Sequence, residues 1–299
     1  MKLTMKILLF LLILAAGPFV VSGQGERPVT VGIFTDCQYC DCNPGMNRFY
    51  RFSLAKIDRC ADTFNTLPLD AVFHLGDMID HGYRSYDSVM PRFARIEAPF
   101  YKVLGNHDFM VGRRYRDSVM HRAGIVDPWY RVDISDWSFL VLNGNDLSYT
   151  APQTKQQRQE RNGMVAGLFS ALRFNGLPWN GGIGSVQMEW LEEQLKLAEQ
   201  GSRKVVVACH FPLFSKGNHN LFNNEELFAL ISRYRCVKAW FSGHYHAGNY
   251  QEREGIHLLN FMGMVDTPHN AFSVVTLTGS AIKVKGYGRE PDRSLELRK

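Results

Sequence analysis

The chain has 299 residues, of which 45% are hydrophobic and 21% are charged, so its composition is that of an ordinary globular protein with ample length for a buried core. One large domain or two small ones would fit this length. The formal net charge is +5, and no run of Lys or Arg indicates a groove that binds nucleic acid.

The N-terminus has the pattern of a secretory signal peptide. Lys2 and Lys6 precede an apolar stretch, residues 7–21, and small polar residues follow it. The stretch has 15 residues and contains a Gly-Pro pair, whereas a membrane-spanning helix needs about 20 apolar residues, which favours a cleaved leader over a retained anchor. We therefore predict a signal peptide at 1–23, one domain at 24–299, and export to the periplasm or the exterior with no membrane span after cleavage.

The first half of the mature chain alternates apolar, β-rich runs with helical patterns. Strands are predicted at residues 29–36, 71–77 and 100–108. Helical spacing of apolar residues predicts helices at residues 48–67, 86–96 and 113–124, the last of them stopped by Gly124.

The second half begins with two runs, 129–134 and 138–145, that we expect to pair as strands. Residues 146–184 are polar and rich in glycine, and this stretch is too long for a simple connection, which indicates an insertion or a functional loop. An amphipathic helix follows, with Ser185 as its natural N-cap and Gly201 as its stop. Another helix is predicted at 224–235, and strands are predicted at 204–210, 237–246, 255–261, 271–277 and 281–287. The alternation predicts an α/β protein, and the consecutive strands at the end predict mixed sheets in a sandwich.

Six cysteines leave several arrangements open in an exported protein. They are Cys37, Cys40, Cys42, Cys60, Cys209 and Cys236. The first three crowd one turn as in a zinc knuckle, but no second pair of Cys or His follows at the usual close spacing. A Cys42–Cys60 bond is geometrically poor, because a helix that begins near Asn47 would carry Cys60 about 20 Å along its axis. Buried free thiols and a short-range bridge among the first three both remain open.

Residues of metal-binding type stand at the ends of five of the predicted strands, where each follows an apolar run. They are Asp36, Gln38, Asp77, Asn106, His107, His210, His244 and His246. Taken singly, each has an ordinary structural explanation, such as a cap, a turn or a buried core histidine. Taken together, they would leave many buried polar groups unpaired, at a cost of about 1–3 kcal/mol each. They also stand at the strand ends where α/β sheets bind ligands. A shared pair of metal ions is the simplest partner for all of them.

The order of these motifs resembles that of the calcineurin-like metallophosphoesterases. Along this chain the motifs are Asp-x-Gln, Gly-Asp, Gly-Asn-His, a single His and Gly-His-x-His. The resemblance implies an α/β sandwich of two mixed β-sheets flanked by helices, with a dinuclear metal site. It also implies two ligand sets that share a bridging Asp77. One set is Asp36, Gln38, Asp77 and His246, and the other is Asp77, Asn106, His210 and His244.

Gln38 stands where most members of that family have histidine. Together with the segments RFYRFSL, NGGIG and GREPDR, it makes the chain similar to the manganese-dependent ADP-ribose/CDP-alcohol diphosphatases. This implies hydrolysis of a phosphoanhydride in a small nucleotide derivative, with two divalent ions. A neutral amide oxygen at Gln38 favours Mn²⁺ or Mg²⁺ over softer metals, and iron is a further candidate.

The expected chemistry is in-line attack on phosphorus by a hydroxide shared between the two ions. His107 is the candidate catalytic residue, because it would be free to protonate the leaving oxygen if its side chain diverges from that of Asn106. Arg48, Tyr50 and Arg51 are candidates for substrate binding, since arginine suits phosphate and tyrosine can stack on a base. An ordinary basic helix surface is the alternative explanation for these three.

Two other functions remain open. The first is a phosphomonoesterase or cyclic-nucleotide phosphodiesterase of the same fold. The second is a binding protein on an inactive scaffold, which would be expected to have lost ligands, whereas here only Gln38 departs from the pattern and it keeps a donor oxygen. The sequence carries no signal for an oligomeric state.

Overall fold

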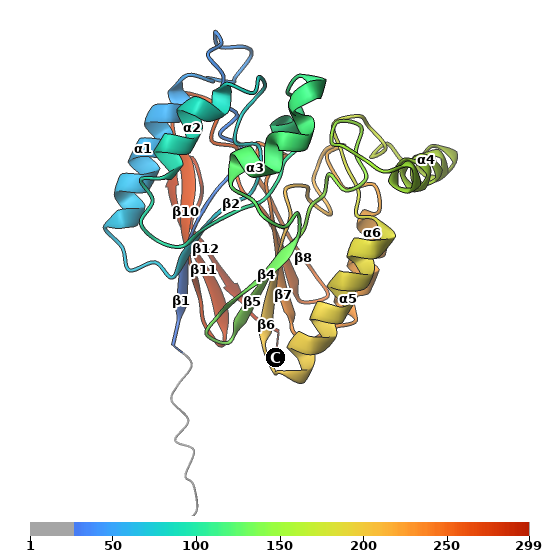
Figure 1. The fold of residues 1–299 in the computed structure, drawn as a ribbon. Coiled ribbons are helices and arrows are strands. Elements are labelled where there is room, and N and C mark those ends of the chain that lie inside the picture. The colour runs from blue at the N-terminus through green and yellow to red at the C-terminus, as the bar shows by residue number, and fades with distance from the viewer. Residues whose placement is uncertain (1–26, 299) are drawn as a thin grey trace, which may run out of the picture.

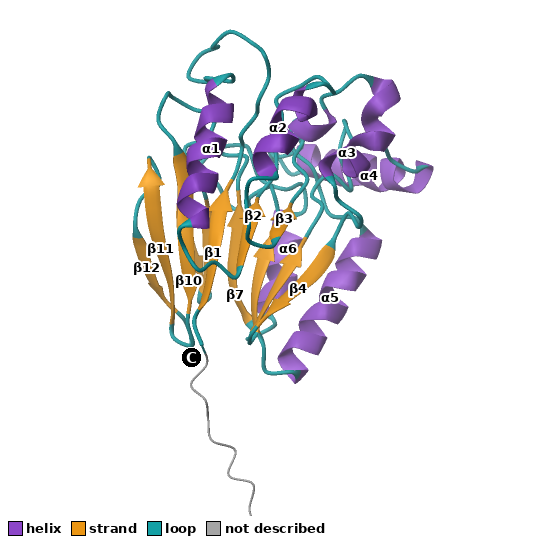
Figure 2. Ribbon diagram, turned by 60° about the vertical axis from the view of Figure 1, so that its left-hand side comes forward, coloured by secondary structure: helices purple, strands orange, loops and turns teal. Residues whose placement is uncertain are grey.

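Two mixed β-sheets face one another in the computed structural model, which describes residues 27–298 (Figures 1 and 2). The strands of the first sheet are, in spatial order, β12 (Arg293–Glu296), β11 (Ala281–Gly288), β10 (Ala271–Leu277), β1 (Val29–Phe34), β2 (Ala71–His74) and β3 (Phe100–Lys102). Those of the second are β4 (Tyr130–Ile134), β5 (Trp137–Val141), β6 (Lys204–Ala208), β7 (Val237–Ser242), β9 (Ile256–Asn260) and β8 (Asn249–Arg253). The sandwich of two mixed sheets predicted from the sequence is therefore confirmed.

Large apolar side chains fill the space between the sheets. Phe73 of β2 stacks on Phe139 of β5 with ring centroids 4.5 Å apart, and Ile33 and Phe241 lie in the same buried cluster. Burying a side chain of this size contributes about 1.5–3 kcal/mol. β1 is buried along most of its length, which explains why its sequence is almost continuously apolar rather than alternating.

Helices cover the outer face of each sheet (Figures 1 and 2). α1 (Phe52–Asn65) and α2 (Ser85–Phe93) cover the first sheet, and α5 (Ser185–Gln200) and α6 (Asn224–Ser232) cover the second. The other helices are α3 (Val119–Ala123), α4 (Lys155–Ser170) and the short 3₁₀ helices η1 (His107–Phe109) and η2 (Arg113–Ser118), and α4 projects at the upper right of Figure 1. α1 buries Ile57 and Phe64 against the first sheet, and α5 buries Leu191 and Leu195 against the second.

The carboxyl ends of the central strands meet at one rim. β1, β2 and β3 run parallel to one another, and so do β5, β6, β7 and β9. The loops that follow these strands therefore gather at the same edge of the sandwich, which is the upper rim in Figure 1.

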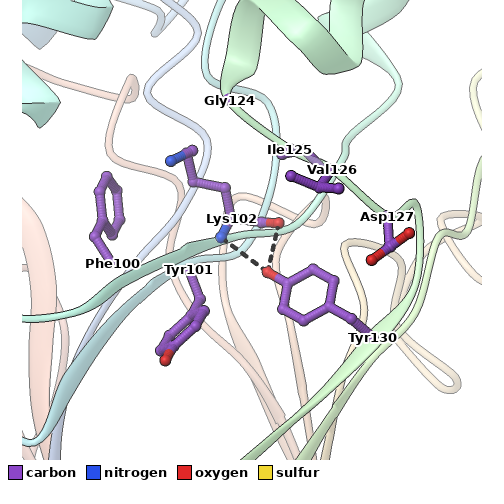
Figure 3. Close-up of a pocket in the computed structure, with 8 residues that line it drawn as sticks. All are labelled: Phe100, Tyr101, Lys102, Gly124, Ile125, Val126, Asp127 and Tyr130. Atoms are coloured by element: carbon purple, nitrogen blue, oxygen red, sulfur yellow. Dashed lines mark hydrogen bonds between the residues drawn. The ribbon is translucent and has the colours of Figure 1, made fainter.

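The side of the sandwich is closed where the edge strands β3 and β4 approach each other. The Tyr130 hydroxyl accepts a hydrogen bond from the Lys102 backbone N–H at 3.1 Å and donates one to the Lys102 carbonyl at 3.0 Å (Figure 3). A small cavity of about 240 Å³ lies beside this contact. The tyrosine thus supplies partners for backbone groups of a short edge strand that would otherwise face water.

Several elements differ from those predicted from the sequence. β8 and β12 were not predicted, and both are outer strands of their sheets. Within residues 146–184, the amphipathic segment 161–176 predicts a surface helix, and the helix found there, α4, begins earlier, at Lys155, where Thr154 caps it through a reciprocal pair of hydrogen bonds with Gln157. The N-cap of α5 is Gly184 and not Ser185, whose backbone N–H instead donates to the Glu160 carboxylate at 2.7 Å.

The remaining predictions concern the cysteines and the N-terminus. Cys40 and Cys42 form a disulfide, and the other four thiols are free and buried, so no three-cysteine knuckle forms. Within the described part of the chain, no helix is both long and apolar enough to span a membrane. The predicted signal peptide, 1–23, lies outside the described residues, so export to the periplasm or exterior stays a prediction.

Candidate active site

The predicted metal ligands lie in loops that leave the carboxyl ends of β1, β2, β3, β6 and β7. Four of them adopt a left-handed backbone: φ is 51° at Asp36, 40° at Gln38, 58° at Asp77 and 67° at His244. Non-glycine residues rarely adopt this conformation, and it costs on the order of 1–3 kcal/mol. The surrounding contacts therefore stabilise a backbone conformation at these four residues that would be unfavourable by itself.

The first half-site brings together Asp36, Gln38 and His246. The His246 Nε2 atom lies 3.2 Å from Asp36 Oδ1 and 3.2 Å from Gln38 Nε2. Gln38 Nε2 also donates to Asp77 Oδ2 at 2.9 Å, which joins this half-site to the next. Asp36 and Gln38 are almost fully buried.

The second half-site is formed by Asp77, Asn106, His210 and His244. His210 Nε2 lies 3.2 Å from Asp77 Oδ2 and 3.2 Å from Asn106 Oδ1. One ligand atom each of Asp77, His210 and His244 lies within 4.8 Å of the others. The Asp77 carboxylate therefore touches groups of both half-sites, as a bridging ligand would.

The donor atoms fit divalent metal ions. Asp36 Oδ1 and Gln38 Oε1 are buried and have no hydrogen-bond partner, a costly condition that a metal ion would relieve. The ligand set combines carboxylate and amide oxygens with imidazole nitrogens, which suits Mn²⁺, Fe²⁺ or Mg²⁺ better than thiophilic metals. Both half-sites thus have the chemistry of metal sites, and the seven predicted ligands are the residues that would hold the ions.

Neighbouring groups orient the histidines. His210 Nδ1 donates to the Leu75 carbonyl at 2.8 Å, which leaves Nε2 for a metal. His246 Nδ1 contacts Asp266 Oδ1 at 2.9 Å, and His244 Nε2 contacts Asn180 Oδ1 at 3.0 Å. Partners of this kind select the tautomer and raise the basicity of a ligating imidazole.

Asp108 holds the loops that carry Asp77 and Asn106. Its fully buried carboxylate accepts hydrogen bonds from the backbone N–H groups of Asp77 at 3.1 Å, Met78 at 2.9 Å and Gly105 at 2.8 Å. Burial and the nearby charge of Asp77 raise the pKa of Asp108 to about 7. The side chain faces the loop backbones and not the metal half-sites, so it has a positioning role.

The charges of the ligand groups are coupled. Burial opposes charge on His210 and His246, but the carboxylates of Asp77 and Asp36 outweigh it and raise the pKa of each imidazole to about 9. Burial likewise opposes charge on the two carboxylates, and the imidazolium groups outweigh it and lower their pKa values. Binding of metal ions must therefore displace protons from the histidines.

The side chains of His107 and Asn106 have different partners, Asp80 for His107 and His210 for Asn106. The His107 Nδ1 atom lies 2.9 Å from the Asp80 carbonyl and 3.3 Å from Asp80 Oδ1, while the His107 backbone N–H donates to Asp77 Oδ1 at 2.7 Å. Burial lowers the pKa of His107, but Asp77 and Asp80 outweigh this and raise it above its ordinary value. The imidazole is thus held by Asp80, next to the loop that carries Asp77.

A cavity of about 420 Å³ opens onto the half-sites. Arg48, Tyr50, His219, Tyr245 and Asp266 are among the residues that line it. Of the three predicted substrate contacts, Arg48 and Tyr50 therefore face this cavity. Arg51 does not line it, and instead forms an ion pair with Asp41 at 2.5 Å and a hydrogen bond with Asn43 at 2.8 Å.

The sequence pattern did not single out Asp108, His219 and Asp266. Asp108 directly follows the Gly-Asn-His motif, and this adjacency was the available signal. His219 lies in the loop after β6, and Asp266 follows β9 without a motif of its own. Their positions depend on how distant loops pack together.

The family model for calcineurin-like phosphoesterases matches residues 29–248. The chain belongs to the calcineurin-like phosphoesterase family. It is accordingly a metal-dependent phosphoester hydrolase, as the order of motifs predicted.

Curated relatives cover most of this phosphoesterase. It is 26% identical to the human manganese-dependent ADP-ribose/CDP-alcohol diphosphatase over 94% of this chain and 96% of the relative. It is 27% identical to the Arabidopsis thaliana protein of the same name over 81% of this chain and 88% of the relative. A dimetal phosphatase from Danio rerio has the same fold, with a TM-score of 0.81 at 21% identity over 90% of this chain and 99% of that one.

Proposed function

We propose that this phosphoesterase hydrolyses the phosphoanhydride of a small nucleoside diphosphate derivative, of the ADP-ribose or CDP-alcohol type, with a pair of Mn²⁺ ions. The observation that carries the two-metal site is the buried Asp77 carboxylate, which contacts Gln38 on one side and His210 on the other. The names of the relatives support the substrate class and the metal.

When bound, a pair of divalent ions would activate water as the nucleophile and neutralise charge on the phosphoryl oxygens. The chain's own groups then orient the substrate and move a proton. His107 Nδ1 is engaged by Asp80, which leaves Nε2 to hold a proton for the leaving oxygen. The raised pKa of His107 favours the protonated form that a general acid needs.

The cavity beside the half-sites suits a nucleotide derivative. Its volume of about 420 Å³ falls within the usual range for small-molecule sites. We assign Arg48 to a phosphate oxygen, since it lines the cavity and its guanidinium carries a positive charge. We assign Tyr50 to stacking on the base.

Hydrolysis assays of the purified mature protein with Mn²⁺ test this proposal. ADP-ribose, CDP-choline, 2′,3′-cyclic AMP and p-nitrophenyl phosphate are compared side by side. We expect ADP-ribose or CDP-choline to turn over fastest, and Asp77→Asn to reduce kcat/KM by more than about 100-fold, because the variant removes a charge from both half-sites.

Other outcomes would separate the alternatives. Faster turnover of the monoester or the cyclic ester would overturn the substrate class while leaving the metal site in place. Absence of turnover with Mn²⁺, Mg²⁺, Fe²⁺ and Zn²⁺ would contradict hydrolysis itself and favour the binding-protein alternative.

A further inference from the structure

A second cavity, of about 480 Å³, lies between η2 and the segment that contains α4. We call it the arginine pocket, because four of its lining residues are Arg113, Arg116, Arg158 and Arg161. It shares no lining residue with the cavity that opens onto the metal half-sites. None of the predicted metal ligands and none of the predicted substrate-binding residues lines it.

The positive charge of the arginine pocket is not neutralised by ion pairs. Among residues 27–298, no carboxylate forms an ion pair with any of its four guanidinium groups, whereas Arg92 and Arg95 at the end of α2 both pair with Asp58. Asp117 is the one carboxylate in the lining, which leaves these five groups with a formal charge of +3. Arg116 Nε is buried and has no hydrogen-bond partner.

Neutral groups hold two of these arginines in place. Arg161 donates to the Ser148 carbonyl at 2.7 Å and lies over the Tyr149 ring at 4.4 Å, and Arg158 donates to the Gln153 carbonyl. These contacts fix the side chains without cancelling their charge. A pre-positioned guanidinium loses little conformational entropy when it binds an anion.

We propose that the arginine pocket is a second, non-catalytic binding site for a small anion that carries two or more phosphate groups. Guanidinium groups bind phosphate oxygens through paired, charge-assisted hydrogen bonds, and a lining charge of +3 matches an anion of several negative charges. The volume of about 480 Å³ accommodates such a ligand. The proposal does not depend on which substrate the metal centre hydrolyses.

Calorimetric titration with inorganic pyrophosphate tests the arginine pocket. The full mature protein is titrated with its metal ions bound and again after chelation, so that binding at the catalytic metals is separated from binding at the pocket. We expect one site per chain that persists after chelation. Its affinity should fall as ionic strength rises, because the attraction is electrostatic.

Substitutions of the pocket arginines test whether pyrophosphate binds in the arginine pocket. The side chain of Arg113 makes no hydrogen bond within residues 27–298, and that of Arg158 donates to a single carbonyl, so replacing these side chains leaves the fold nearly unperturbed. Arg113→Gln/Arg158→Gln should weaken pyrophosphate binding by about 10- to 100-fold. Arg113→Lys/Arg158→Lys should recover part of the affinity, since it keeps the charge and loses the forked geometry.

Arg114→Gln is the matched control. Arg114 lies in the same 3₁₀ helix and carries the same charge, but it stacks on Tyr115 at 4.7 Å and does not line the pocket. It should leave the affinity unchanged. Loss of all binding on chelation, an equal loss of affinity in Arg114→Gln, or equally tight binding of citrate would each overturn the proposal.

Discussion

His74 is a fully buried imidazole in β2, packed against the rings of Phe34 and Phe93 with centroids 4.8 and 5.2 Å away. Its Nε2 atom has no hydrogen-bond partner, and its Nδ1 accepts a hydrogen bond from the Gly76 backbone N–H at 3.3 Å. Burial lowers the pKa of His74 to about 3, so the folded protein keeps it neutral. The side chain serves as an aromatic core residue despite lying in a strand that leads to Asp77.

This buried histidine makes stability depend on pH. The unfolded chain protonates His74 near its ordinary pKa of 6.5, while the folded chain resists protonation down to about pH 3. The unfolded state therefore binds more protons between these values, and stability falls as the pH is lowered through this window. We expect His74→Phe to flatten that fall, measured by urea unfolding of chelated protein from pH 7 to pH 4. Identical pH slopes for variant and wild type would contradict this assignment.

Among the secondary-structure elements, the loop after β2 and the loop after β3 approach each other so closely that position 105 must be a glycine. A Cβ atom at Gly105 would lie 2.1 Å from Asp77 Oδ1 and 2.4 Å from its backbone nitrogen. Neither atom can retreat easily, because Asp77 already has a left-handed backbone and Asp108 holds both loops by hydrogen bonds. The position of the Asp77 carboxylate thus depends on a residue without a side chain at position 105.

Gly105→Ala should therefore displace the bridging carboxylate. We expect affinity for Mn²⁺ and kcat/KM to fall at least about 10-fold, as measured by metal titration and steady-state kinetics. Gly163→Ala is the matched control, because a Cβ at that position in α4 meets nothing within 4 Å. It should keep full activity and raise the free energy of unfolding by up to about 1 kcal/mol through helix propensity. Normal Mn²⁺ binding by Gly105→Ala would refute the steric argument.

At the scale of the whole molecule, the metal half-sites join the two sheets. Asp36, Asp77 and Asn106 follow strands of the first sheet, whereas His210, His244 and His246 follow strands of the second. Ions bound between them would link the two halves of the sandwich. They would also neutralise buried carboxylates that otherwise depend on protonated histidines.

Metal ions should accordingly stabilise the folded protein. A ligand present at about 100 times its dissociation constant adds about 2.7 kcal/mol when it binds only the folded state. We expect the Tm to rise by several degrees as Mn²⁺ is added to chelated protein, in differential scanning calorimetry. Asp77→Asn should lose most of that rise. An equal rise in wild type and Asp77→Asn would show that Mn²⁺ stabilises the protein elsewhere.

The α/β sandwich and the eight polar residues at its strand ends could be predicted from the sequence. Both are local signals, because the apolar strand and the polar residues that follow it are continuous in the chain, and parallel strands place their carboxyl ends at one rim. The Gly-Asn-His and Gly-His-x-His motifs could therefore be located without coordinates.

The distant side chains that complete the site could be identified only from the folded structure. Asp266 orients His246, Asn180 contacts His244, and Arg51 pairs with Asp41 and does not face the substrate cavity. The arginine pocket likewise joins η2 to the region of α4. Such contacts depend on how separate loops pack. Two residues that are far apart in the chain and meet only after folding leave no periodic pattern in the sequence from which their contact could be predicted. The physical reason is that strand and turn preferences are encoded locally, whereas pairing of charges depends on distances that exist only in the folded chain.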